Sequence, residues 1–86
     1  MNRPKLNREW VGLRCRMRYA IAWNSGAALE PGAFVVVTGT GGTNTGGGGL
    51  YIATETTPRI GGRCTPTHLE PIERIGPPEP ARKRRT

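Results

Sequence analysis

The sequence contains no aspartate and has only one histidine and one serine among its 86 residues. A serine or cysteine nucleophile needs a base and a third group that orients the base. His68 is the sole imidazole, Ser25 is the sole serine, and only a glutamate such as Glu70 is left to supply the third group. The six glutamates are dispersed, with no pair at an informative spacing. We therefore expect a protein that is not an enzyme and takes no small-molecule substrate.

Long apolar runs are also missing, and apolar residues make up only 35% of the chain. No stretch approaches the roughly 18–20 apolar residues that span a bilayer, and the N-terminus lacks the apolar segment of a signal peptide. So little apolar material builds a small core without a deep catalytic cavity. We expect one soluble, cytoplasmic domain with no membrane partner.

Cysteine is scarce, with Cys15 and Cys64 only. Together with His68, four residues after Cys64, they offer at most three zinc ligands. Structural zinc sites usually have four protein ligands in paired short spacings, and no fourth candidate of that kind is present. Cys15 lies between Arg14 and Arg16 in an alternating segment and so belongs to its apolar face. A free cysteine in such a place behaves as a small hydrophobic residue. We expect core or incidental thiols, no disulfide, no metal and no cofactor.

Glycine and proline, by contrast, are abundant, with thirteen and eight residues. This composition favours short strands joined by tight turns over a helical bundle. Pro31-Gly32 predicts a type II turn, since proline presets φ and glycine accepts the positive φ that follows. Gly61 and Gly62 predict a bulge or sharp bend. The predicted strands are residues 10–23, 33–40, 50–55, 59–65 and 70–75, with a single 3-10 turn at 66–69 and no other helix.

The first predicted strand has the clearest pattern, because apolar and polar residues alternate from Trp10 for more than a dozen residues. Alternation of this kind is typical of a strand with one buried face. The strand is expected to bend or break near residues 20–23. Its predicted inward residues are Val11, Leu13, Cys15, Met17, Tyr19, Ile21 and Trp23, and its outward arginines are Arg14, Arg16 and Arg18.

Residues 39–49 hold seven glycines and no lysine. A phosphate-binding loop of the Walker type needs a lysine and a following helix, and neither is present. The segment instead predicts a flexible hairpin tip, or a contact loop that orders on binding.

Five short strands without a long helix predict an all-β fold, and a small five-stranded SH3-like barrel fits best, because closure removes exposed edges. An OB-fold is the alternative, but it usually needs more residues and a helix. The predicted organisation is a flexible N-terminal lead at 1–9, the barrel at 10–75 and a Pro-rich basic tail at 76–86, with both tails disordered.

Four segments together resemble small SH3-like barrel proteins encoded by tailed phages and prophages, and more distantly KOW-type barrels. They are WVGLRCRMR (10–18), NSG (24–26), EPGAFVVV (30–37) and RCTPTHLEPI (63–72). The resemblance covers residues 10–73 and implies the barrel fold and a bacterial or phage-infected host cell. Relatives often carry a Cys-rich turn late in the barrel, whereas this chain has only Cys64 there, so a metal-bound version is not expected. Many members have no assigned activity.

The formal net charge is +7, from thirteen lysines and arginines against six glutamates. Most of the excess lies at the two ends of the chain. Such a balance indicates a polyanionic partner, or only serves solubility.

We therefore expect a binding module that contacts DNA or RNA. Three arginines on one strand face, about 6.6–6.8 Å apart, can follow a phosphate backbone, and Trp10 or Trp23 can stack on a single strand. Pairing of the arginines with Glu55 or Glu70 across the sheet is the plainer interpretation of that face. The candidate nucleic-acid-binding residues are Arg14, Arg16, Arg18, Arg59, Arg63, Arg82, Lys83, Arg84 and Arg85, with Tyr51 beside them.

The alternative function is a protein-interaction or virion-associated module that docks on a host or phage protein. SH3-like barrels often bind through aromatic grooves, and this chain has aromatic residues that could line one. They are Trp10, Tyr19, Trp23 and Tyr51.

Overall fold

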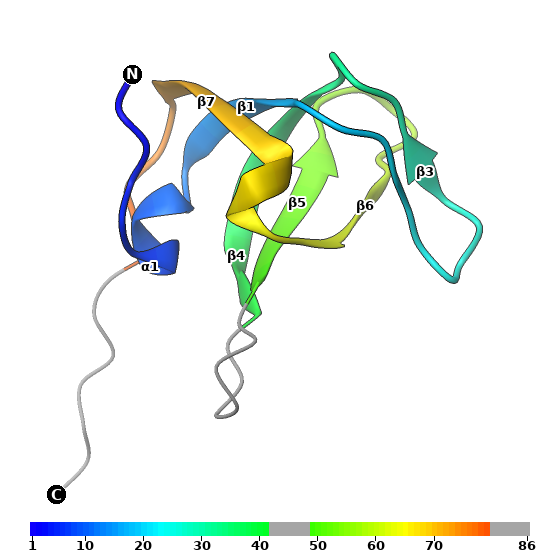
Figure 1. Ribbon diagram of the computed structural model, residues 1–86, viewed down its shortest axis with the longest axis horizontal. Coiled ribbons are helices and arrows are strands. Elements are labelled where there is room, and N and C mark those ends of the chain that lie inside the picture. The colour runs from blue at the N-terminus through cyan, green and yellow to red at the C-terminus, as the bar shows by residue number, and fades with distance from the viewer. Residues whose placement is uncertain (42–48, 80–86) are drawn as a thin grey trace, which may run out of the picture.

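The computed structural model describes residues 1–41 and 49–79 of the chain. In these ranges the fold is all-β, as the sequence predicts, and one five-stranded sheet makes up most of it (Figure 1). Its strands are β1 (Leu13–Met17), β4 (Phe34–Gly41), β5 (Gly49–Thr54), β6 (Gly61–Cys64) and β7 (Leu69–Arg74). The smaller elements are the hairpin of β2 (Ile21–Ala22) and β3 (Ala28–Leu29), the helix α1 (Asn7–Trp10) and the 3-10 turn η1 (Pro66–His68). No helix in these ranges has the length and apolar character needed to cross a membrane.

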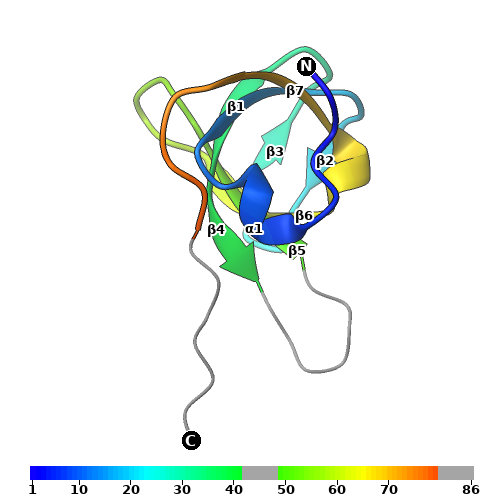
Figure 2. The same ribbon diagram turned by 90° about the vertical axis from the view of Figure 1, so that its left-hand side faces the viewer.

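The strands of the large sheet lie in the order β6-β5-β4-β1-β7, and neighbouring strands are antiparallel. Figure 2 shows the sheet curving round the core, and Figure 1 shows α1 at one end of the molecule and the β2–β3 hairpin at the other. Among the described residues the backbone pairing ends at β6 on one side and at β7 on the other. Closure of the sheet into an SH3-like barrel therefore stays a prediction.

The alternating pattern of the first predicted strand is confirmed over β1 and lost beyond it. Leu13, Cys15 and Met17 are buried, whereas the arginines between them lie on the other face. The strand ends at Met17, where the chain leaves the sheet, and β2 pairs with β3 instead. Tyr19, predicted to point inward, is 52% exposed. A period of two predicts the pleat, but tertiary contacts decide where the pleat ends.

The turn that precedes β4 has the predicted geometry. Gly32 has a φ of 92°, and the amide of Ala33 donates to the carbonyl oxygen of Glu30 at 3.2 Å. A hydrogen bond across four residues with a positive φ at the third defines the type II turn expected for Pro31-Gly32.

Gly61 and Gly62 do not form the predicted bulge. β5 and β6 pair in continuous register, with Ile52 opposite Gly62. The indole of Trp23 occupies the place that a Cβ on Gly62 would need, and its Nε1 donates to the carbonyl oxygen of Arg63 at 2.7 Å. Glycine is required here because a ring from the β2–β3 hairpin closes over the strand. That contact joins distant parts of the chain, so the local pattern does not reveal it.

Residues 1–9, predicted to be a flexible lead, include most of α1 and are bonded to the sheet. Arg3 donates to two carbonyl oxygens of η1 and β7 at 2.6 and 2.7 Å. Its guanidinium lies 5.0 Å from the centre of the Trp10 ring. Arg74 donates to the carbonyl oxygen of Glu9 at 2.6 Å and so satisfies the end of α1. The sequence does not predict this helix because its four residues are too few for a helical period.

The segment after β7, predicted as the start of a flexible tail, is bonded to the domain as far as Glu79. The amide of Gly76 donates to the carbonyl oxygen of Gly12 at 3.0 Å. Gly12 has a φ of 87°, and a Cβ there would collide with the Gly76 carbonyl. The amide of Glu79 donates to the carbonyl oxygen of Arg8 at 3.0 Å, and the Glu79 carboxylate accepts from Thr40 Oγ1 at 2.9 Å. The folded part therefore passes the predicted boundary at residue 75.

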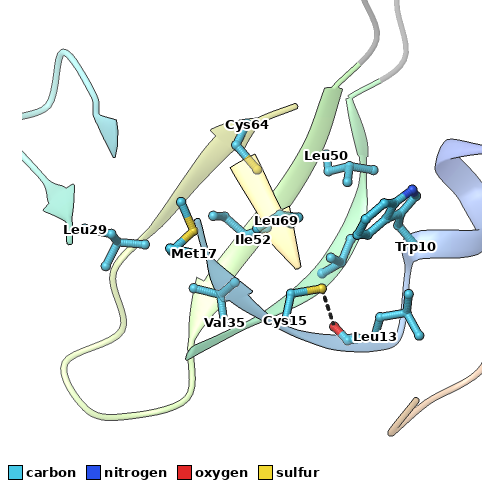
Figure 3. Packing of buried hydrophobic residues seen from close by; sticks show 11 residues of the cluster. Trp10, Leu13, Cys15, Met17, Leu29, Val35, Leu50, Ile52, Cys64 and Leu69 are labelled. Atoms are coloured by element: carbon cyan, nitrogen blue, oxygen red, sulfur yellow. Dashed lines mark hydrogen bonds between the residues drawn. The ribbon is translucent and has the colours of Figure 1, made fainter. Parts of the chain in front are cut away.

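The core lies between the large sheet, α1 and the β2–β3 hairpin (Figure 3). In the ranges described, every buried side-chain nitrogen or oxygen has a hydrogen-bond partner, so burial leaves no polar group uncompensated there. The buried apolar residues are Trp10, Leu13, Cys15, Met17, Leu29, Val35, Val37, Leu50, Ile52, Cys64 and Leu69.

The two cysteines belong to this core. Cys15 is 0% and Cys64 is 4% exposed, and both are free. Burial raises the pKa of Cys15 to about 12 and the pKa of Cys64 to about 11, because an apolar environment disfavours the thiolate. Both are therefore neutral, unreactive thiols at physiological pH.

We expect the free energy of unfolding to fall as the pH rises from 9 towards 12. An unfolded cysteine ionises with a pKa of 9.0, whereas folding raises the pKa of both thiols. The folded state binds more protons in this window, so the contribution present below pH 9 is lost as the pH passes the folded pKa values. Denaturant titrations at pH 8 and pH 11 measure the change. A Cys15→Ala, Cys64→Ala double variant is the control, and an equally steep decline in that variant would contradict the prediction.

Candidate nucleic-acid interface

Two of the three arginines of the first predicted strand face outward but are paired with glutamates. Arg14 Nε lies 2.9 Å from Glu55 Oε1, and Arg14 Nη1 lies 3.5 Å from Glu73 Oε2. Arg16 Nη2 lies 3.0 Å from Glu70 Oε1. The hydrogen bond to Glu55 raises the pKa of Arg14. These are the cross-strand pairs of the plainer interpretation, and each offsets a positive charge that phosphate binding would use.

Arg18 follows β1 and forms no ion pair within residues 1–41 and 49–79. Its guanidinium lies 5.3 Å from the centre of the Tyr19 ring, and its Nη2 donates to Tyr19 Oη at 3.4 Å. The Tyr19 ring in turn meets His68 edge to face, with ring centres 6.2 Å apart. An exposed ring thus has a guanidinium and an imidazole as its neighbours.

A second exposed ring lies on the outer face of β5. Tyr51 is 45% exposed and pairs with Gly39 of β4 and Arg63 of β6. A Cβ built on Gly41 would stand 3.3 Å from Cε2 of Tyr51, and one on Gly39 would stand 3.9 Å from Cδ2. The ring therefore lies over backbone that carries no side chains. Arg63 reaches the same place, where its Nη2 donates to the carbonyl oxygen of Gly41 at 3.2 Å.

We call Tyr51, Arg63, Gly39 and Gly41 the Tyr51 platform. From the sequence, Tyr51 and Arg59 or Arg63 are expected to widen the patch of Arg14, Arg16 and Arg18, and the cross-strand register does bring Tyr51 and Arg63 together. These two do not widen that patch, because β5 and β4 separate Arg63 on β6 from Arg14 on β1. Three strand spacings amount to about 14 Å.

Arg59, another predicted contact residue, lies in the connection between β5 and β6. It is exposed and lines a hollow of about 310 Å³ whose other walls include Val36, Thr38, Glu55 and Ile75. Glu55 is also the partner of Arg14, so Arg59 lies near the β1 arginines, whereas Arg63 lies three strands away. The predicted basic residues that the structure describes therefore do not form one patch.

Neither tryptophan is available as the predicted stacking surface. Trp10 is 1% exposed and belongs to the core. Trp23 packs on Gly62 and uses its only hydrogen-bond donor on Arg63. The exposed aromatic rings of the described residues are those of Tyr19, Phe34 and Tyr51. The Phe34 ring is partnered by the Arg14 guanidinium, 4.4 Å from its centre.

Within the part of the chain that the structure describes, no group of three or more His, Cys, Asp or Glu residues could hold a metal ion. Cys15 and Cys64 lie in the core, whereas the Nδ1 of His68 is 3.0 Å from the Thr65 hydroxyl and its ring faces Tyr19. The three residues weighed as zinc ligands thus have other partners.

The basic tail residues Arg82, Lys83, Arg84 and Arg85 lie outside the described residues, as does most of the Gly39–Gly49 segment. The start of that tail is nevertheless placed. Glu79 is bonded to Thr40, which stands between Gly39 and Gly41 in the chain. Thr40 is paired with the buried Leu50, so its side chain lies on the face of β4 opposite to the Tyr51 ring. The tail therefore begins near the Gly41 end of β4, but on the other face of the sheet from the Tyr51 platform.

The position of the Tyr51 ring over two glycines is not predicted from the sequence. Gly39 and Gly41 share a face of β4 because they are two residues apart, but the predicted strand ends at residue 40, which assigns Gly41 to the glycine-rich loop. Pairing them with Tyr51 requires the β4–β5 register, which shifts between Val37 and Gly39. Comparisons of the chain with family models, curated proteins and solved structures find no match.

Proposed function

We propose that this protein is a non-enzymatic binding module for single-stranded nucleic acid, with the Tyr51 platform as its stacking site and the basic C-terminal residues as its electrostatic contact. The observation that carries the proposal is the exposed Tyr51 ring lying over Gly39 and Gly41 beside the Arg63 guanidinium. The phage or prophage setting and the cytoplasmic location suggested by the resemblance are part of this proposal.

Stacking explains why a ring is presented in this way. Every base has a π-face, so an exposed aromatic side chain binds single strands with little sequence preference. Arg63 stands on the neighbouring strand, where a guanidinium can contact the phosphate next to a stacked base. A duplex offers its bases only at the edges, so a stacking platform favours unpaired strands.

Charge supports the same partner. The net charge of +7 is concentrated towards the chain ends. On the outer face of β1, Arg14 and Arg16 are already paired with glutamates. The basic cluster of Arg82, Lys83, Arg84 and Arg85 follows Glu79, which is bonded to Thr40 at the end of β4 that carries Gly39 and Gly41, on the opposite face of the sheet from Tyr51. Phosphate contacts from such a cluster add affinity without sequence choice.

Replacing Tyr51 by alanine tests the proposal. We expect affinity for single-stranded DNA or RNA to fall by about 1–3 kcal/mol, which is the contribution of one stacked base. Tyr51→Phe keeps the ring and is expected to keep most of the affinity. Fluorescence anisotropy at two salt concentrations, with a duplex as comparison, measures both variants. Equal binding by folded Tyr51→Ala and the unchanged protein would remove the platform as the site.

Docking on another protein is the second candidate function. A hollow of about 480 Å³ between the β3–β4 turn and the β5–β6 connection favours it, because apolar side chains provide much of its wall. These are Leu29, Ala33, Phe34, Pro58 and Ile60. This function becomes the preferred one if the folded domain without its basic tail has no nucleic-acid affinity left.

A further inference from the structure

We infer that the nucleic-acid site continues from the Tyr51 platform along the end of β6 to a second stacking site formed by Tyr19, with Arg18 and His68 at its sides. This inference rests on the proposed function and extends it to a longer stretch of single strand. Neither Tyr19 nor His68 was among the residues that the sequence suggested for nucleic-acid contact.

The path between the two sites follows from the backbone. Arg63 belongs to β6, and Thr65, two residues further, is still extended, with φ −106° and ψ 159°. Residues two apart in an extended segment point to the same side, about 6.6–6.8 Å from each other. Thr65 Oγ1 then lies 3.0 Å from Nδ1 of His68. The Arg63 side of the platform is thus joined to His68 through a single intervening side chain.

The second site repeats the chemistry of the first. Tyr19 is 52% exposed, and the guanidinium of Arg18 lies 5.3 Å from its ring centre. The His68 ring stands at 87° to the Tyr19 ring. Since Thr65 engages Nδ1, the other ring nitrogen of His68 is the one left to meet a ligand. The tyrosine ring can stack on a base, and the guanidinium and the imidazole can contact the phosphate of the same nucleotide.

The backbone holds this second site in place. The amide of Arg18 donates to the carbonyl oxygen of His68 at 2.7 Å, which ties the end of β1 to η1. Arg18 also borders a hollow that Glu70 lines, but that carboxylate is paired with Arg16 at 3.0 Å. A positive charge therefore remains beside Tyr19.

Two sites on one path predict that affinity depends on strand length. Oligonucleotides of about 4 and about 16 nucleotides bracket the usual site sizes. We expect Tyr51→Ala to weaken binding of both lengths. We expect Tyr19→Ala to leave the short oligonucleotide unaffected and to weaken the long one about five-fold or more, the effect of losing one stacked base. Tyr19→Phe is the matched control, and circular dichroism establishes that each variant is folded.

The possible results separate this inference from the function on which it rests. If Tyr19→Ala binds the long strand as tightly as the unchanged protein while Tyr51→Ala does not, the site ends at the platform and the inference is wrong. If Tyr19→Ala weakens both lengths equally, Tyr19 is not a second site and the inference is again wrong. If neither variant affects either length, the proposed function itself fails.

Discussion

Replacing Trp10 by alanine is expected to lower the free energy of unfolding by about 3–5 kcal/mol, the usual cost of removing a buried tryptophan or phenylalanine side chain. Trp10 is 1% exposed and connects α1 to the core. Arg3 lies 5.0 Å from its ring centre and would lose that contact as well. Since small domains have only about 5–15 kcal/mol of stability in total, the variant loses a large part of it. Denaturant unfolding followed by circular dichroism measures the difference.

A matched control exists in the same N-terminal segment. Leu6 is 44% exposed, and Leu6→Ala is expected to change stability by no more than about 0.5 kcal/mol. If Trp10→Ala were as stable as Leu6→Ala, residues 1–10 would not belong to the cooperative fold. The lead would then be flexible, as the sequence alone suggests.

Ending the chain after Glu79 is expected to reduce the salt dependence of single-strand binding strongly. The truncation removes Arg82, Lys83, Arg84 and Arg85. Each phosphate contact contributes about 0.7 to the slope of log K against log salt concentration, so four contacts contribute about 2.8. Residual binding should remain and should fall further with Tyr51→Ala, because the platform is intact. Anisotropy titrations over a series of salt concentrations give the slopes.

The position of the truncation decides what it tests. A chain that ends at Glu79 keeps the bonds of this residue to Arg8 and Thr40 and is expected to unfold like the full chain. A chain that ends at Ile75 loses those bonds and the one from Gly76 to Gly12, so its stability should fall. An unchanged slope in the chain ending at Glu79 would show that the tail does not contact phosphate.

The strands and one turn of this protein are determined locally, and the sequence predicts them for that reason. Alternation places Leu13, Cys15 and Met17 on one face of β1, and Pro31-Gly32 dictates its own turn through fixed φ angles. The positions of β4, β5 and β7 follow in the same way, to within a residue at each end.

The elements that the sequence does not predict all depend on partners far along the chain. α1 ends on the guanidinium of Arg74, and Gly62 accommodates the ring of Trp23. The ion-pair partners of charged side chains also come from distant parts of the chain. An alternating strand shows that Arg14 faces outward, but only the sheet order and the β5–β6 connection bring Glu55 to it.

The all-β class, the outward face of β1 and the basic character of the chain can be inferred without a structure, because backbone sterics and side-chain period are properties of neighbouring residues and net charge is a property of the composition. Which charges are paired and which aromatic rings are exposed depend on how distant segments pack together. Register and chain crossing bring residues such as Gly39, Tyr51 and Arg63 together, and a contact between distant segments leaves no periodic trace in either of them.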